Sequence, residues 1–118
     1  GKGEPWGQGA EIPGEVKVKI DVWKNASIPL PMVVDRGDLC VIASAENLNA
    51  AAETALHKMY HFLHERAGFR GPDAACLISL VGQLQICQIV NPLHTVRVTF
   101  PLSVLRQNGY EFDREIGR

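Results

Sequence analysis

The sequence lacks any long hydrophobic run, and this absence excludes a membrane-spanning helix. Pro, Gly, Gln or Asp interrupts every apolar stretch well before the ~18 residues that such a helix requires. Basic clusters are also missing. The 12 Lys and Arg residues nearly balance the 13 Asp and Glu residues and give a formal net charge of −1. Binding to nucleic-acid phosphates needs a positive face, so we expect neither a nucleic-acid partner nor a membrane.

Cysteine is scarce, and its pattern argues against a disulfide framework or a zinc motif. The three cysteines, Cys40, Cys76 and Cys87, are odd in number, lie in apolar stretches and match no metal or redox spacing. No basic segment followed by an apolar one opens the sequence, so we expect no signal peptide. Free thiols in a reducing compartment predict a cytoplasmic protein.

The length and composition are those of one folded domain. The chain has 118 residues, of which 46% are hydrophobic and 21% charged, and it contains no internal repeat. Residues 1–14 hold five glycines and two prolines and predict a loop. We expect the domain to span residues 15–106, followed by a polar tail over residues 107–118.

The clearest strand pattern follows the glycine-rich loop. Four β-branched residues alternate with polar or aromatic ones at a period of two, namely Val16, Val18, Ile20 and Val22. Such alternation is typical of a strand with one buried and one wet face. We therefore expect these four side chains in the core, with Lys17 and Lys19 exposed.

A long helix is predicted over residues 46–67. Ser44 or Asn47 can cap its start, and Gly68 followed by apolar Phe69 is typical of a Schellman stop. At about 100° per residue, one apolar stripe collects Leu48, Ala52, Ala55, Leu56, Met59, Phe62 and Leu63.

A short helix and further strands complete the expected fold. Gly71 as cap and Pro72 at the first position open a helix through about Leu80, which Gly82 ends. Strands are expected over residues 28–34 (an edge, because of its prolines), 39–45, 84–86 and 96–100, with turns at residues 36–38 and 91–92. The result is an α+β domain with mixed or antiparallel strands, one long helix and one short helix.

Three histidines on the long helix could hold a metal ion. His57, His61 and His64 stand at i, i+4 and i+7, a spacing that puts zinc ligands on one helix face. The same wheel places them opposite the apolar stripe, with no acidic support nearby. We therefore interpret them as a solvated or interface face rather than a metal site.

Other candidates for nucleophilic or acid–base catalysis are weak when taken from the residues alone. Cys87 lies in an apolar strand with no charged neighbour to lower its pKa, and Ser79 lies in an apolar helix, where serine normally bonds a carbonyl one turn back. Glu4 stands between Gly3 and Pro5 near the start, where its carboxylate could act as general base or metal ligand. The alternative for residues 1–4 (GKGE) is a frayed end.

Several stretches, in order and spacing, resemble the acetamidase/formamidase family. They are residues 7–16 (GQGAEIPGEV), the strand that follows, the helix leading to Ala67-Gly68-Phe69, residues 73–92 and residues 95–101. The similarity covers roughly residues 1–106 and is to the carboxy-terminal portion of the family only. The implied fold is acetamidase/formamidase-like, and the implied activity is hydrolysis of short linear amides, such as formamide and acetamide, to a carboxylic acid and ammonia.

The resemblance also implies site residues and a cofactor. Gly1, Gly3 and Glu4 match the end of a family motif of the type His-Ala-x-Gln-Gly-Asp-Gly-Glu, while Lys2 replaces its aspartate. Glu4 would be catalytic, and the two glycines would contact substrate through their backbone. A divalent metal, with zinc as one possibility, would be bound mainly by residues that this chain lacks.

Two interpretations remain open. In the first, the chain is a portion or subunit of an amidohydrolase and works with an upstream companion subunit or as a homo-oligomer on a small amide. In the second, it is a stand-alone domain of the same fold that serves self-association without catalysis.

The helix wheel generates a first testable prediction. Replacing His57, His61 and His64 together by alanine should leave the metal content unchanged, because side chains facing solvent without acidic support do not bind zinc tightly. Elemental analysis after dialysis should find less than about one equivalent of zinc that depends on these residues. Loss of a stoichiometric metal in the triple variant would contradict the solvated-face interpretation.

Overall fold

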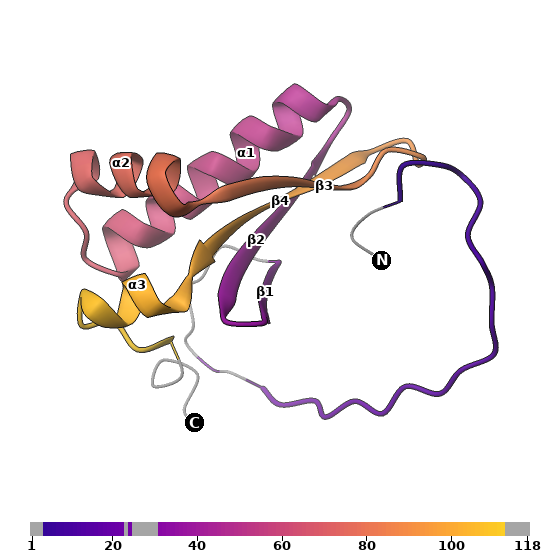
Figure 1. The fold of residues 1–118 in the computed structure, drawn as a ribbon, viewed down its shortest axis with the longest axis horizontal. Coiled ribbons are helices and arrows are strands. Elements are labelled where there is room, and N and C mark those ends of the chain that lie inside the picture. Colours follow the sequence, from indigo (N-terminus) through magenta and orange to yellow (C-terminus); the bar gives the residue numbers. More distant parts are fainter. Residues whose placement is uncertain (1–3, 23, 25–30, 113–118) are drawn as a thin grey trace.

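A four-stranded antiparallel sheet organises the chain (Figure 1). The computed structural model describes residues 4–22, 24 and 31–112. The strands are β1 (Met32–Asp35), β2 (Asp38–Ala45), β3 (Gln83–Gln88) and β4 (His94–Pro101), and their order across the sheet is β1-β2-β4-β3. Each neighbouring pair is antiparallel, which confirms the α+β prediction.

The helices are α1 (Leu48–His61), the π-helical turn η1 (Phe62–Arg66), α2 (Gly71–Val81) and α3 (Leu102–Gln107). Helix α1 packs on β2 and β4, and α2 lies beside α1, next to the start of β3 (Figure 1). The expected long and short helices are therefore present. Within the described residues, no helix is long and apolar enough to cross a membrane.

The core forms where α1 meets the alternate residues of the two central strands. Because side chains alternate across a strand, every second residue of β2 and β4 faces α1. The buried residues of this layer are Leu39, Val41, Ala43, Ala51, Ala55, Met59, Phe62, Leu63, Val96, Val98 and Phe100. Burying one large apolar side chain is worth about 1.5–3 kcal/mol, so this layer dominates the stability of the domain.

The long helix begins and ends close to where the sequence predicts. Asn47 caps α1, since its Oδ1 accepts a hydrogen bond of 2.9 Å from the Ala50 amide. Gly68 takes φ +75°, and the Phe69 amide donates back to the Leu63 carbonyl over 3.0 Å. The last helical turn is π rather than α, so the returning bond spans one residue more than a Schellman motif.

The predicted apolar stripe of the long helix is shifted at two positions. Ala51, which the prediction omits, is fully buried, whereas Leu56 is 36% exposed and Ala52 only half-buried. The fully buried residues of α1 are Ala51, Ala55 and Met59, which follow one another at intervals of four. Leu56 therefore lies at the margin of this row and faces α2.

The first strand connection is a tight turn at the predicted residues. Arg36 and Gly37 take φ of 51° and 91°, and the two strands meet through the pair Asp35 and Asp38. Two successive positive φ values match the right-handed twist of a hairpin. Strand β1 lies at the sheet edge, as its prolines predict, and residues 28–30 of that expected strand lie outside the described residues.

The structure contradicts the strand expected at residues 16–22. Val16, Val18, Ile20 and Val22 are between 70% and 84% exposed, and the segment runs away from the sheet after Glu4 (Figure 1). An alternating pattern indicates which face a strand can bury. Burial itself needs a neighbouring strand and another layer of the fold that packs on that face. The described part of the chain supplies neither to this segment, so the core assignment was wrong.

The carboxy-terminal residues contribute to the core beyond the expected domain boundary. Tyr110 and Phe112 fall in the predicted polar tail, yet their rings contact Phe62 edge-on at centroid distances of 5.6 and 6.4 Å. Aromatic side chains bury large areas, which outweighs the polar composition of their neighbours. The packed domain therefore extends at least to Phe112.

Phe62 offers a test of this packing, with Leu56 as its control on the same helical segment. Phe62→Ala should lower the free energy of unfolding by about 3–5 kcal/mol, because it leaves a cavity beneath the aromatic cluster. Leu56→Ala should cost less than about 1 kcal/mol, because that side chain is partly exposed. Chemical denaturation of both variants measures the difference, and equal losses would contradict the observed stripe.

Candidate functional site

Glu4 is attached to the end of β3 by its backbone. Its amide donates to the Cys87 carbonyl over 2.6 Å, and its carbonyl accepts from the Ile89 amide over 3.3 Å. The side chain is exposed. The frayed-end alternative does not hold for Glu4, whereas Gly1 and Gly3 lie outside the described residues.

Arg97 forms the main polar contact on the face of the sheet opposite α1. Its Nε donates to Gln85 Oε1 over 2.7 Å, and its Nη1 lies 4.0 Å from Asp35 Oδ2. Arg97 lies between core residues Val96 and Val98, so its side chain points to the other face. One guanidinium thereby links β1, β3 and β4.

Gln88 organises the connection between β3 and β4 next to Glu4. Its Oε1 accepts from the amides of Val90 (3.0 Å) and Asn91 (3.1 Å), and its Nε2 donates to Thr95 Oγ1 (3.0 Å). A β-bulge between Ile86 and Gln88 places this side chain on the same face as Thr95. The predicted turn at residues 91–92 is thus stabilised by a side chain that the sequence analysis did not single out.

Neither thiol on the sheet is an activated nucleophile. Burial raises the pKa of Cys87 and that of Cys40, and the positive charge of Arg97 opposes this only in part. The expectation that Cys87 has no charged neighbour was wrong. Its pKa is nevertheless raised, because burial affects it more than the charge of Arg97 does. Both groups are neutral thiols near pH 7, a state that attacks carbonyl carbon poorly.

Ser79 has the structural role expected of a helical serine. Its Oγ donates to the Ala75 carbonyl over 3.3 Å, one turn back along α2. Among the hydrogen bonds of the described residues, none joins Ser79 to a general base. Ser79 therefore has the contacts of an ordinary serine on a helix surface and not those of a catalytic serine.

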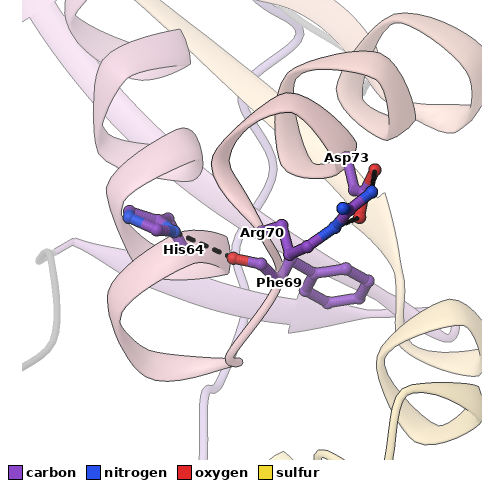
Figure 2. Close-up of polar contacts among 4 residues, drawn as sticks. All are labelled: His64, Phe69, Arg70 and Asp73. Atoms are coloured by element: carbon purple, nitrogen blue, oxygen red, sulfur yellow. Dashed lines mark hydrogen bonds and ion pairs between the residues drawn. The ribbon is translucent and has the colours of Figure 1, made fainter.

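The three histidines lie on the exposed side of the long helix, as predicted, and the rings of His57 and His61 stack at a centroid distance of 6.5 Å. His61 Nδ1 donates to Glu65 Oε1 over 2.9 Å, so the expectation of no acidic support nearby was wrong. His64 Nδ1 donates to the Phe69 carbonyl over 2.8 Å (Figure 2). In the described part of the chain, no group of three or more His, Cys, Asp or Glu side chains could hold a metal ion. These residues therefore do not fit the implied divalent metal, and its absence from this helix stays a prediction.

The start of α2 lies against the end of the long helix (Figure 2). Arg70, rather than Gly71, is the cap residue, and its guanidinium donates to both carboxylate oxygens of Asp73 at 2.7 and 3.0 Å. These hydrogen bonds lower the pKa of Asp73. A Cβ at Gly71 would lie 2.7 Å from Tyr60 Oη, so glycine permits the close approach of the two helices.

An apolar groove of about 560 Å³ separates the outer surfaces of α1 and α2. Its lining residues are Glu53, Leu56, His57, Tyr60, His61, Ala75 and Ile78. The volume suits a small ligand. Of its two imidazoles, that of His61 is hydrogen-bonded to the Glu65 carboxylate over 2.9 Å, and the rest of the lining is mainly apolar.

Taken together, the described residues hold only part of what amide hydrolysis requires. Hydrolysis needs an activated water or nucleophile and donors that stabilise the oxyanion. Glu4 supplies one exposed carboxylate at the end of β3, and Arg97 supplies one cation on the open face of the sheet. The remaining groups of such a site would have to come from elsewhere.

The comparisons with known proteins point to one group of solved structures. No protein-family model and no curated protein match the chain. The crystal structure of an acetamidase from Bacillus halodurans shares 38% sequence identity, with a TM-score of 0.68 over 70% of this chain and 28% of that one. A recombinant predicted acetamidase/formamidase from Thermoanaerobacter tengcongensis shares 34%, with a TM-score of 0.70 over 75% of this chain and 30% of that one.

An acetamidase from Yersinia enterocolitica shares 27% identity, with a TM-score of 0.65 over 70% of this chain and 25% of that one. The chain therefore spans between a quarter and a third of the length of these three proteins. Most of their fold has no counterpart in it.

The three cysteines yield a prediction about reactivity. Near neutral pH, iodoacetamide should modify exposed Cys76 first, Cys87 slowly and Cys40 only on unfolding, since burial keeps the last two as thiols. Raising the pH should accelerate modification of Cys87, as its thiolate forms only above the ordinary pKa of a thiol. Mass spectrometry of the alkylated protein, with Cys76→Ser as control, measures the order; a Cys87 as fast as Cys76 at neutral pH would contradict it.

Proposed function

This chain is related in sequence and fold to the acetamidase/formamidase family, of which it represents a portion, and we propose that it forms part of an amidohydrolase. The proposed reaction is cleavage of the C–N bond of a short linear amide, such as formamide or acetamide, to a carboxylic acid and ammonia. The similarity to two acetamidase or acetamidase/formamidase structures at more than 30% identity carries the proposal. The cysteine pattern supports a cytoplasmic location.

In the proposed reaction Glu4 acts as general base or ligand at the rim of a site completed by another polypeptide. Its two backbone hydrogen bonds, to Cys87 in β3 and to Ile89 just after it, fix the main chain beside the carboxylate. Acid–base catalysis requires this because its efficiency depends on geometry. The backbone amides of Gly1 and Gly3 would contact the substrate. The described residues do not fit a divalent metal, so any such ion would be bound by the companion polypeptide.

A second candidate function is self-association without catalysis. The exposed apolar face of residues 16–22 favours it, since an uncovered row of β-branched side chains is typical of an interface. Fold kinship alone does not supply a working site, because activity depends on the residues of the site and not on the scaffold.

The activity prediction separates these functions. The purified chain should release little or no ammonia from formamide or acetamide, with or without added zinc, because Glu4 is the one carboxylate assigned to the reaction and the described residues hold no complete oxyanion site. Adding the remainder of the Bacillus halodurans acetamidase, the segment outside the match, should raise turnover. Glu4→Gln should then reduce turnover by at least about tenfold, since positioned acid–base groups contribute about 10²–10⁴-fold.

Glu11→Gln is the matched control, because Glu11 is an exposed carboxylate in the same segment and should leave turnover unchanged. Robust activity of the purified chain that survives Glu4→Gln would show that the site lies elsewhere. Absence of turnover in every combination would favour the non-catalytic function.

A further inference from the structure

Residues 15–22 carry the pattern of a strand that has no partner in the described chain. Val16, Val18, Ile20 and Val22 are 83%, 70%, 84% and 83% exposed and share one side of the extended segment. The other side is polar, and there Lys19 Nζ lies 3.1 Å from Asp21 Oδ2. β-Branched residues in alternation favour a strand, and leaving them in water forfeits their burial.

The outer edge of β3 has the complementary pattern. Beyond the single bridge to Glu4 at Gln88, no strand of the described chain lies against this edge. Leu84 and Ile86 are 52% and 49% exposed there, although both face the helical side of the sheet through their partners Val98 and Val96. Gln83 and Gln85 face the opposite side.

A hollow continues this apolar edge toward the helices. It has a volume of about 230 Å³ and is lined by Leu56, Ile78, Ser79, Gly82, Gln83, Leu84 and Val98. A strand added beside β3 would cover the hollow with its apolar side chains.

The two patterns match in phase. When an apolar residue of the 15–22 segment lies beside Leu84, the next apolar one lies beside Ile86, because both patterns repeat every two residues. Lys17, Lys19 and Asp21 then lie with the glutamines on the polar side. This match holds for either strand direction.

We propose that residues 15–22 of one copy of this chain add as a strand to the β3 edge of a second copy. A second copy is the occupant that the structure favours, because the chain carries both the unpartnered strand and the unpartnered edge that complements it. If each copy adds its 15–22 segment to the β3 edge of the other, the two copies form a closed twofold dimer. Both segments and both edges are then covered. The inference rests on the self-association function proposed above and not on whether the chain contributes to catalysis.

The first test is the mass of the full chain in solution. Light scattering coupled to gel filtration should give a multiple of 13.0 kDa over a range of protein concentrations. Val18→Asp should weaken association at least about tenfold while circular dichroism and the melting temperature of the domain persist, since Val18 lies outside the core. Lys19→Gln, on the polar side of the same segment, is the matched control and should leave association unchanged.

The second test uses complementation between two defective copies. Leu84→Asp should also dissociate the assembly, because it places a charge on the receiving edge. Mixing this variant with Val18→Asp should restore a one-to-one complex, since one copy retains the strand and the other retains the edge. A merely unfolded variant would not be rescued in this way.

Three results would overturn the proposal. They are a chain that is monomeric at every concentration, association that survives Val18→Asp, and a mixture of the two variants that stays dissociated although both are folded. None of these measurements involves amide hydrolysis, so their outcome is independent of the proposed activity.

Discussion

The pairing of β2 with β4 is the interaction on which the rest of the structure depends. Eight residue pairs, from Asp38 with Pro101 to Ala45 with His94, join segments that lie more than 45 positions apart in the sequence. Their register sets which residues face α1 and which face away. The same pairing that buries Val98 therefore places Arg97 on the opposite side of the sheet, within reach of Gln85.

The elements with local signals could be predicted closely. Asn47 caps α1 through a side-chain oxygen that few residue types offer, so the sequence itself indicates the start of the helix. Gly68 and the turn at residues 36–38 depend on positive φ values, which few residue types adopt readily. The fold class followed from strands on both sides of two helices. The segment at residues 16–22 was misplaced because alternation indicates a face to be buried, without indicating what will bury it.

The polar contacts were harder to predict, for a related reason. Arg97 with Gln85, and Gln88 with the amides beyond it, depend on strand register and on a bulge, both of which are set by long-range pairing. His64 was grouped with two other histidines by helical spacing, yet its partner is a backbone carbonyl beyond the end of the helix. Glu4 was identified from its glycine-rich surroundings and from a family motif, but its attachment to β3 could not be read from local sequence.

The bulge at the end of β3 determines which face of the sheet the residues after it point to. Up to Ile86 the even-numbered residues of β3 face the helices, but the extra residue at Cys87 shifts this order, so that Gln88 faces the other way and meets Thr95. Natural insertions or deletions of one residue before this point would reverse the two faces of the strand, whereas changes within the turn beyond it would not. Insertions and deletions among related chains should therefore be tolerated in the turn and be removed by selection from the strand.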